Sequence, residues 1–469
     1  MTHEYDIPTV TVRRRPNPWF LVAILGGIIV FAAIRHFWYV VNWPGYRLIT
    51  VIWTIGFAVT AFQWIVSWWE QPYKVTRRRQ LQLDGMKVTV NIPVYNEEPL
   101  VLDRVLYAIF NQSRPPNRVQ VVDDGSIEED YTEVRSYWLR HHPSHIEFSW
   151  LRTENQGKKR AQAETFRGDN ADVFVTLDSD TTLERDALRE GLMPFADRRV
   201  YSVAGLELAW NHDCNLLTRI KSVNALVWQF VTCSSQNVLG GNVLVNRGTY
   251  ALYRGNMIRE TLDAYVGETF MGRPVMLGDD TMLTLYALGR GRAVQQPSAV
   301  CFAMYPETLS HTMRQWLRWM RGTSLRTLWR LRYLSPLSWA WWYTVLTTWG
   351  YAAFLAVVAA VVVDWPYSKE FAITALYISA VWTWVVASRM LILKRYDQSV
   401  VQTVESVVLV PIAILWMTLV LRPVRLYGTL TMSRQGWVTR QSGAETRTLL
   451  EPVAGQAPES ENEELAGVS

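Results

Sequence analysis

Long apolar runs near both ends of the chain enclose a middle part in which short apolar runs alternate with polar loops. The first two long runs, Trp19 to Val41 and Leu48 to Trp69, are separated by a short turn and are about the length of helices that cross a bilayer. The pattern therefore predicts a transmembrane hairpin over 19–69, preceded by a short cytoplasmic N-terminus, 1–18.

Three more apolar runs follow the middle part: Trp339 to Val363, Phe371 to Leu393 and about Val401 to Leu421. The first two predict another membrane hairpin. The third contains Pro411 and has basic residues at both ends, and a full crossing would place the arginines that follow it outside the cell. We therefore expect a re-entrant or in-plane segment there, within a C-terminal transmembrane/re-entrant region 339–430.

The middle of the chain, residues 85–310, carries short apolar strands that alternate with helical segments. This pattern is typical of an α/β fold with a mainly parallel sheet. Three of the strands end in polar loops, in the segments KVTVNIPVYNEE, RVQVVDDGS and ADVFVTLDSD. Ligands of open α/β sheets bind beyond the carboxyl ends of the strands, so we expect the binding site at this edge.

Basic residues indicate the orientation of the chain in the membrane. Arg13 to Arg15 precede the first hairpin and Arg77 to Arg79 follow it, which predicts that the middle domain is cytoplasmic. The content of 23 Trp in 469 residues is high and typical of membrane interfaces, whereas the net charge of +5 is modest. We predict a multi-pass protein of the plasma membrane, with a disordered acidic tail at 441–469.

Carboxylates gather at the predicted strand ends and at one helix start. Asp178 and Asp180 directly follow a strand, at a spacing that allows one or both to reach a divalent cation shared with a phosphate. Such a pair alone is most often a solvated turn, but here it is the third polar strand end. Asp279 and Asp280 precede an apolar helix, where capping is the simple explanation and general-base catalysis is compatible with it.

The basic, aromatic stretch QWLRWMRGTSLRTLWRLRYL follows the domain, at residues 315–334. It suits a nucleic-acid-binding helix, a helix on a membrane surface or part of an active site. No nucleic-acid-binding motif accompanies it, and we exclude nucleic acid as a partner. Residues 311–336 predict an amphipathic helix at the cytoplasmic face of the lipid bilayer, with four arginines that can meet headgroups: Arg321, Arg326, Arg330 and Arg332.

Five motifs, taken in order, resemble those of membrane-embedded, processive family 2 glycosyltransferases, a group that includes hyaluronan, cellulose and chitin synthases. They are VYNEE at 94–98, DDGS at 123–126, DSD at 178–180, GDD at 278–280 and QWLRW at 315–319. Within the group the chain is most similar to hyaluronan synthases, because it has GDD and an element at 431–440 that resembles WGTR. Val438 in that element and Thr281 after GDD depart from the pattern.

The resemblance implies a GT-A-type catalytic domain, inserted between transmembrane helices, that polymerises UDP-sugars and passes the growing polysaccharide chain through the membrane. Inversion at the anomeric carbon would make the product β-linked. Hyaluronan synthesis from UDP-GlcNAc and UDP-GlcA is the leading expectation. The alternatives are a chitin-oligosaccharide, cellulose or other β-glycan synthase and, outside enzymes, a nucleotide-sugar-binding scaffold or transporter.

The resemblance also implies roles for individual residues. Asp280, beside Asp279, would deprotonate the acceptor hydroxyl, and Asp180 with Asp178 would bind Mg²⁺ or Mn²⁺. The residues that it implies for binding of the UDP-sugar and the acceptor are Tyr95, Glu97, Asp123, Asp124, Lys158, Lys159, Asp178, Arg254, Gln315, Arg318, Trp319, Trp437 and Arg440.

Overall fold

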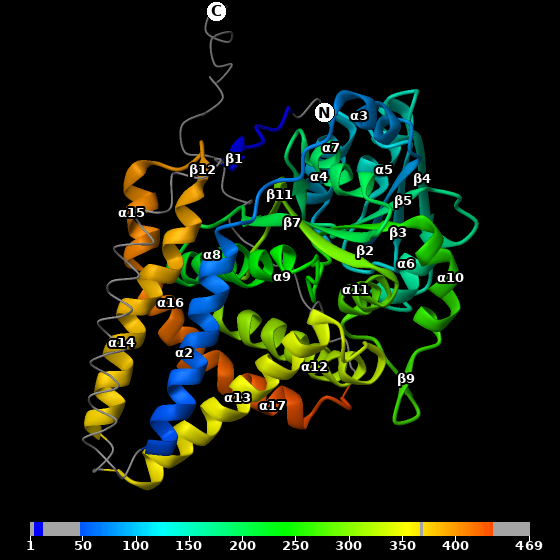
Figure 1. Cartoon of the computed structure of the whole chain (residues 1–469). Coiled ribbons are helices and arrows are strands. Elements are labelled where there is room, and N and C mark those ends of the chain that lie inside the picture. Colours follow the sequence, from blue (N-terminus) through cyan, green and yellow to red (C-terminus); the bar gives the residue numbers. More distant parts are fainter. Residues whose placement is uncertain (1–3, 13–46, 366–368, 435–469) are drawn as a thin grey trace, which may run out of the picture.

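The computed structural model describes residues 4–12, 47–365 and 369–434. An α/β domain lies on one side of the molecule and long apolar helices lie on the other (Figure 1). The first predicted span, Trp19 to Val41, lies outside the described residues. So do Trp437, Arg440 and the predicted acidic tail.

An eight-stranded sheet forms the centre of the α/β domain, in the order β4-β3-β2-β5-β8-β7-β11-β6. Only β8 and β6 run antiparallel to their neighbours in this sheet, so the other strands point the same way and the prediction of a mainly parallel sheet is confirmed. The strands are β2 (Val88–Val94), β3 (Arg118–Asp123), β4 (Glu147–Arg152), β5 (Val173–Leu177), β6 (Thr182–Leu183), β7 (Val200–Ala209), β8 (Tyr250–Arg254) and β11 (Arg292–Ala303).

Helices cover both faces of this sheet, with α4, α5 and α7 on one side and α6, α10 and α11 on the other (Figure 1). A π-helical turn, Trp228–Cys233, joins α8 to α9, and a small hairpin of β9 (Thr269–Phe270) and β10 (Arg273–Pro274) precedes α11. The helices are α3 (Arg77–Asp84), α4 (Pro99–Phe110), α5 (Thr132–His141), α6 (Lys158–Phe166), α7 (Ala187–Leu192), α8 (Leu216–Val227), α9 (Ser234–Val238), α10 (Gly255–Val266), α11 (Asp279–Arg290) and α12 (Leu309–Tyr333).

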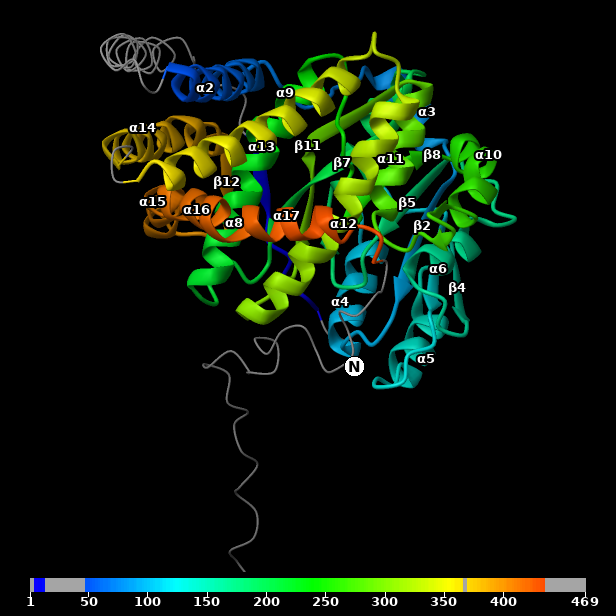
Figure 2. The same cartoon turned by 90° about the horizontal axis from the view of Figure 1, so that it is seen from below.

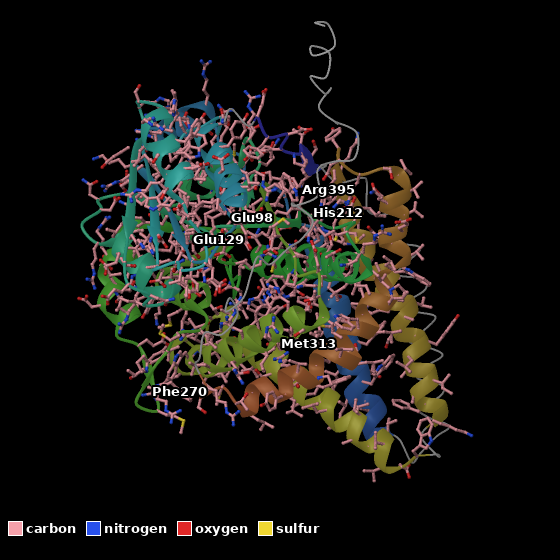
Figure 3. All side chains as sticks on the ribbon, turned by 180° about the vertical axis from the view of Figure 1, so that it is seen from behind. Glu98, Glu129, His212, Phe270, Met313 and Arg395 are labelled. Atoms are coloured by element: carbon pink, nitrogen blue, oxygen red, sulfur yellow. The ribbon has the colours of Figure 1, made fainter. Side chains whose placement is uncertain are left out.

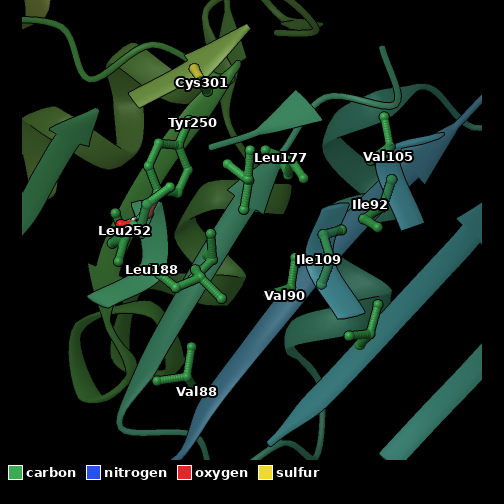
Figure 4. Packing of buried hydrophobic residues seen from close by; sticks show 14 of the residues in the cluster. Val88, Val90, Ile92, Val105, Ile109, Leu177, Leu188, Tyr250, Leu252 and Cys301 are labelled. Carbon is green, nitrogen blue, oxygen red and sulfur yellow. Dashed lines mark hydrogen bonds between the residues drawn. The ribbon is translucent and has the colours of Figure 1, made fainter. Parts of the chain in front are cut away.

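Strand β2 is buried along its whole length, including its polar residues Thr89 and Asn91. All seven residues of β2 are buried, because helices cover both faces of the sheet. Val90 and Ile92 of β2 belong to one apolar cluster with Val105 and Ile109 of α4 (Figure 4). The first partly exposed residue after the strand is Tyr95, in the loop at its carboxyl end.

The apolar helices comprise α2 (Arg47–Ser67), α13 (Trp339–Val363), α14 (Lys369–Ala387) and a run that follows them. By length and hydropathy, the described residues contain three candidate membrane spans: Trp339–Val363, Phe371–Ile392 and Val410–Leu430. The segment after α14 pairs, as strand β12 (Leu393–Arg395), with strand β1 (Val10–Val12). Arg395 lies near His212 of the α/β domain (Figure 3) and donates to the carbonyl of Ala209 at 3.0 Å.

The third C-terminal apolar run differs from the prediction. It is formed by α15 (Val400–Val408), α16 (Val410–Trp416), a π-helical turn (Met417–Leu421) and α17 (Arg422–Leu430). The long continuous part therefore begins after α15 and ends about nine residues later than the predicted stretch. Pro411 and Pro423 each lie in the first turn of a helix, where no backbone N–H is needed, so Pro411 begins a helix and does not interrupt one.

Helix α12 lies between the α/β domain and α17, and both views show α17 alongside it (Figures 1 and 2). Arg326 and Arg330 are buried: Arg326 pairs with Glu268, and Arg330 donates to the carbonyl of Leu244 at 2.7 Å. The prediction that these two arginines meet lipid headgroups is therefore wrong. Helical periodicity identified a basic face but did not show that this face packs against the domain.

Candidate active site

The three polar strand ends meet at one edge of the sheet, as their parallel order requires. Tyr95 to Glu98 follow β2, Asp123 and Asp124 lie at the end of β3, and Asp178 to Asp180 follow β5, with β2 between the other two strands. The hydroxyl of Ser179 donates to Oε2 of Glu97 at 2.8 Å. Loops that are about eighty residues apart in the chain therefore form one polar surface.

The loops after β2 and β3 are held together by their own side chains. Asn96 has a positive φ of 47°, a conformation that asparagine tolerates, and its Oδ1 accepts from the backbone N–H of Ile127 at 3.0 Å. Asp123 accepts from the N–H of Ser126 at 2.9 Å. Tyr95 is half-buried beside this loop pair. A ligand at this edge would thus meet a preformed surface.

Asp124 is already engaged by the loop that precedes α6. Its two carboxylate oxygens accept from the backbone N–H groups of Gln156 and Gly157, both at 2.8 Å. Burial raises the pKa of Asp124, although these two N–H groups favour the charged form. Asp124 therefore fixes the start of α6, where the next residue is Lys158.

Lys158 lies between two of the predicted acidic motifs. Its Nζ is 2.5 Å from Oδ1 of Asp178 and 3.6 Å from Oδ2 of Asp279. Burial alone would lower the pKa of Lys158, but the carboxylates of Asp178 and Asp279 outweigh it and raise that pKa. The side chain is therefore a permanent cation that joins the end of β5 to the start of α11.

Lys159 points elsewhere, and the structure does not bring it together with Lys158, Asp178 and Asp280. Its buried Nζ donates to Oε2 of Glu268 at 2.8 Å and to the carbonyl of Val275 at 3.1 Å. Consecutive residues of a helix project in directions about 100° apart, so only one of the two lysines can face the site.

Arg254 also lies away from the other predicted residues, so the structure does not bring it to the group around Asp280. It is the last residue of β8, which runs antiparallel to β5, so it pairs with Val173 at the start of β5. Its guanidinium donates to backbone carbonyls there, including that of Val200 at 2.8 Å. The sequence pattern shows a strand end but not the direction of that strand in the sheet.

The surroundings of Asp280 raise the pKa of its carboxyl group. Gly278, with a φ of +72°, turns the chain into α11, and Asp280 follows in the first turn. Its Oδ1 accepts from the N–H of Thr281 at 2.6 Å, and its Oδ2 accepts from the N–H of Gly248 at 3.3 Å. Burial, together with the charge of Asp279, raises the pKa of Asp280 to about 6, in the range that suits a general base.

The sequence analysis missed Gly248, which lies at the centre of this group. A Cβ atom on Gly248 would lie 3.0 Å from Nζ of Lys158, 3.7 Å from Cβ of Asp280 and 3.9 Å from Oδ1 of Asp178. Glycine therefore leaves free space between the cation and the two carboxylates. A glycine two residues before a strand was the only signal in the sequence.

Glu207 was missed too, although it holds the loop that carries Gly248. This buried carboxylate of β7 accepts from the hydroxyl of Thr249 at 2.9 Å and from that of Tyr305 at 2.7 Å, and it pairs with Arg247 at 3.4 Å. A single carboxylate within the apolar strand VYSVAGLELA was the signal for it.

Helix α12 links this group to the apolar helices. A Cβ atom on Gly322 would lie 3.2 Å from the backbone nitrogen of Gly278, so the helix touches the turn before Asp279 and Asp280. One turn earlier, Trp319 is 46% exposed and contacts Trp316, whose Nε1 donates to the carbonyl of Leu421 at 3.0 Å. Met313, on the same helix, lies between the domain and the apolar helices (Figure 3).

The two other predicted residues of this helix are half-buried. Gln315 accepts from Nζ of Lys221 at 3.0 Å, and Arg318 lies one residue before Trp319. Both residues therefore belong to α12, the helix that also carries Trp319.

Asp178 and Asp180 would hold a divalent cation. The described residues contain no group of three or more His, Cys, Asp or Glu side chains that could bind a metal by themselves. Mg²⁺ commonly takes only one or two carboxylates and completes its shell with phosphate oxygens and water, so two carboxylates at a strand end fit such an ion when a phosphate is bound beside it. The pairing of Lys158 with Asp178 adds a positive charge at the same place.

Comparisons with known proteins point to one type of domain. Residues 173–386 match the family described as Glycosyl transferase family group 2. The chain is 36% identical over 238 residues to hyaluronan synthase of Streptococcus pyogenes. This alignment covers 50% of this chain and 57% of that protein. It is 33% identical over 258 residues to an N-acetylglucosaminyltransferase of Rhizobium meliloti (strain 1021). This alignment covers 54% of this chain and 59% of that protein. The chain thus spans little more than half the length of these curated relatives.

A solved structure shares the fold. The mannosyltransferase PcManGT from Pyrobaculum calidifontis, solved in complex with GDP-Man and Mn²⁺, superimposes with a TM-score of 0.50 at 19% identity. The likeness covers 81% of this chain and 99% of that one. It confirms the GT-A fold that the motifs implied.

Proposed function

We propose that this chain, which carries a family 2 glycosyltransferase domain of GT-A fold, is a processive, inverting glycosyltransferase of the membrane. It polymerises UDP-sugars into a β-linked polysaccharide and passes the product across the bilayer. The observation that carries the proposal is the contact of Asp280 with the loop at Gly248, beside Lys158 and Asp178, on a domain whose helix α12 leads directly to apolar helices.

Asp280 is the proposed general base. Its raised pKa lets it accept a proton from the acceptor hydroxyl near neutral pH, and the hydroxyl then attacks the anomeric carbon on the face opposite to UDP. The proton ends on Asp280, the new glycosidic bond forms as the bond to UDP breaks, and the configuration of the sugar inverts. Lys158 supplies positive charge where negative charge develops on the departing diphosphate.

Asp178 and Asp180 would hold Mg²⁺ or Mn²⁺ next to that diphosphate. When bound, such an ion stabilises the negative charge of the leaving group. The solved mannosyltransferase contains Mn²⁺, which supports a divalent cation for this chain as well. Chelation should therefore stop transfer, and added Mg²⁺ or Mn²⁺ should restore it.

The remaining predicted residues divide between nucleotide and acceptor. Tyr95, Glu97, Asp123 and Asp124 are proposed to form the uridine side, since they surround the ends of β2 and β3. Trp319 is proposed as a platform for the acceptor sugar, because sugar C–H faces stack on exposed aromatic rings. Gln315 and Arg318 belong to the same acceptor side.

The three candidate spans support a multi-pass protein of the plasma membrane whose catalytic domain is cytoplasmic. UDP-sugars would then reach the site from the cytoplasm. The basic residues that flank the first predicted hairpin support this orientation.

Hyaluronan, made from UDP-GlcNAc and UDP-GlcA, is the first candidate product, because one set of relatives is named hyaluronan synthase. The second candidate is a polymer of GlcNAc, favoured by the N-acetylglucosaminyltransferase relatives.

Purified protein should be incubated with labelled UDP-GlcNAc, UDP-GlcA and UDP-Glc, singly and in pairs. We expect a high-mass product only with UDP-GlcNAc and UDP-GlcA together. Absence of any UDP-sugar-dependent product would contradict the proposal.

Substitution of Gly248 by valine should abolish most transfer without unfolding the domain. The new side chain would fill the space between Lys158, Asp178 and Asp280, so the reacting groups could not approach one another. The matched control is Gly289→Val, since Gly289 of α11 has no heavy atom within 4 Å of an added Cβ. Transfer rates and melting temperatures of the two variants would be compared. Wild-type transfer by Gly248→Val would show that this space is not the reaction site.

A further inference from the structure

The short hairpin between α10 and α11 ends in an exposed methionine. Strands β9 and β10 pair Phe270 with Arg273, so the loop between them consists of only Met271 and Gly272. The φ angles of these two residues are 51° and 77°, and a type I′ turn requires positive values at both positions. Met271 is 78% exposed. The hairpin projects downward from the α/β domain in Figure 1, past α12 and to the level of α17.

Methionine is not the residue that such a turn prefers. Asparagine, aspartate and glycine adopt a positive φ at little cost, whereas a long apolar side chain does not. Among the described residues other than glycine, only Asn96 and Met271 have a positive φ. Met271 therefore departs from the local preference, and its exposed side chain gains little from contacts within the described part of the chain. A departure of this kind indicates a contact outside the chain.

The base of the hairpin is fixed to α12. The backbone N–H of Val275 donates to the carbonyl of Glu268 at 3.0 Å, which closes the base, and the Glu268 side chain pairs with Arg326 of α12. Phe270, labelled in Figure 3, packs edge-on against Trp329 of the same helix, with ring centres 5.9 Å apart. The position of the exposed tip is therefore set relative to the last turns of α12.

The same end of α12 leads into a candidate membrane span. Trp329 also contacts the ring of Tyr333, the last residue of α12, at 5.8 Å between ring centres. Leu337, two residues before the span Trp339–Val363, is 96% exposed. Three of the first four residues of this span are tryptophan, the residue typical of the boundary between lipid and water. The bilayer surface therefore lies close to the end of α12, on which the hairpin packs.

The charges near this surface are positive. Arg273 is exposed on β10, and Arg332 is exposed in the last turn of α12. Neither the hairpin, residues 269–274, nor the segment 331–338 contains an acidic residue. Exposed apolar side chains with neighbouring arginines are typical of segments that bind the surface of a membrane with anionic lipids.

We propose that the β9–β10 hairpin is a bilayer anchor of the catalytic domain. The side chain of Met271 inserts among the lipids at the cytoplasmic face, beside Leu337, and Arg273 meets the phosphate of anionic headgroups. The proposal rests on the membrane location given above and goes beyond it, because it assigns a lipid contact to a part of the α/β domain outside the candidate spans. No step of the proposed reaction depends on it.

The test places a fluorescent label on the tip of the hairpin in the full chain. Cys214 is the exposed one of the three cysteines, so Cys214→Ser removes the background. Met271→Cys is labelled with a polarity-sensitive fluorophore and reconstituted, without UDP-sugars, in vesicles of phosphatidylcholine and phosphatidylglycerol whose acyl chains carry a nitroxide quencher. The matched control is Leu81→Cys, since Leu81 is exposed on α3 at the opposite end of the domain (Figure 1). We expect several-fold stronger quenching at position 271 than at position 81.

A second pair of variants separates the tip side chain from the fold of the hairpin. The label is moved to Thr269→Cys, an exposed position of β9, and Met271→Asn is added. Asparagine suits the positive φ, so the melting temperature should not fall, whereas quenching at position 269 should drop to near the Leu81 level. Arg273→Gln with the label at position 269 should lower quenching when phosphatidylglycerol is present and leave it unchanged in pure phosphatidylcholine.

Several results would overturn the inference. Equal quenching at positions 271 and 81, or quenching that Met271→Asn leaves unchanged, would show that the tip does not reach lipid. A label at position 271 that is shielded only at high protein-to-lipid ratio would assign the tip to a second copy of the chain. Shielding only after UDP-sugars are added would assign it to the product. These outcomes leave the proposed function intact, whereas a chain that does not enter vesicles would contradict the proposed membrane location as well.

Discussion

Replacement of Asp280 by asparagine is expected to lower the rate of sugar transfer by about 10²- to 10⁴-fold, the usual contribution of a general base. Asparagine has nearly the same shape, and its single carboxamide oxygen can still accept from the N–H of Thr281, the shorter of the two contacts of Asp280 at 2.6 Å, whereas the 3.3 Å contact with the N–H of Gly248 is lost. It cannot take the proton of the acceptor hydroxyl. Binding of UDP-sugar, measured by titration calorimetry, should therefore remain close to that of the unchanged protein.

The pH dependence of the unchanged protein provides a second readout. Only the deprotonated form of Asp280 accepts a proton, and burial with Asp279 raises its pKa to about 6. The rate at low UDP-sugar concentration should therefore rise with pH up to this value and level off above it, and Asp280→Asn should lack the rise. Asp263→Asn, an exposed aspartate of α10, is the control and should keep both rate and profile. An unchanged rate in Asp280→Asn would favour a scaffold or transporter that only binds nucleotide-sugars.

Replacement of Glu268 by glutamine is expected to destabilise the protein by about 3–5 kcal/mol, because it leaves two buried cations without a counter-charge. The Glu268 side chain is 7% exposed and pairs with Arg326 and with Lys159, while Nε1 of Trp329 donates to it at 3.0 Å. Burial alone would raise the pKa of Glu268, but Arg326 and Lys159 outweigh it and lower that pKa, so the group is charged.

The same substitution should also impair transfer, because Arg326 supports the turn before the proposed base. Its guanidinium donates to the carbonyls of Gly278 at 3.0 Å and Leu277 at 3.1 Å. Melting temperature in detergent and transfer rate below the melting temperature would be measured for each variant. The matched control is Glu260→Gln, whose partner Arg290 lies 3.2 Å away at the surface, where an ion pair contributes about 0–1 kcal/mol. Equal melting of the two variants would show that Glu268 is not the counter-charge described.

The sequence determined the elements and the edge of the sheet at which the site lies. The apolar residues of KVTVNIPV, followed by a polar loop, predict a buried strand that ends at a polar edge of the sheet, and the structure buries Thr89 and Asn91 of this strand as well. Parallel neighbours then bring Glu97, Asp123 and Asp178 to one edge. The local sequence pattern is sufficient for these conclusions, because it shows which segments are buried strands and which polar residues follow their carboxyl ends.

Only the tertiary structure decided which side chains meet. Gly248, Lys158 and Asp280 are far apart in the chain, and no periodicity indicates that they surround one space. Arg254 lies away from the site because β8 runs antiparallel to β5. Lys159 contacts Glu268 and not Asp178, because consecutive residues of α6 project in different directions.

The arginines of α12 illustrate the same limit. Their spacing predicted a helix with a basic face, but a buried carboxylate almost sixty residues earlier, Glu268, decided that Arg326 turns inward. Helical periodicity determines which residues share a face, because it follows from backbone geometry alone. The partner of that face depends on contacts between segments distant in sequence, and these exist only once the chain has folded.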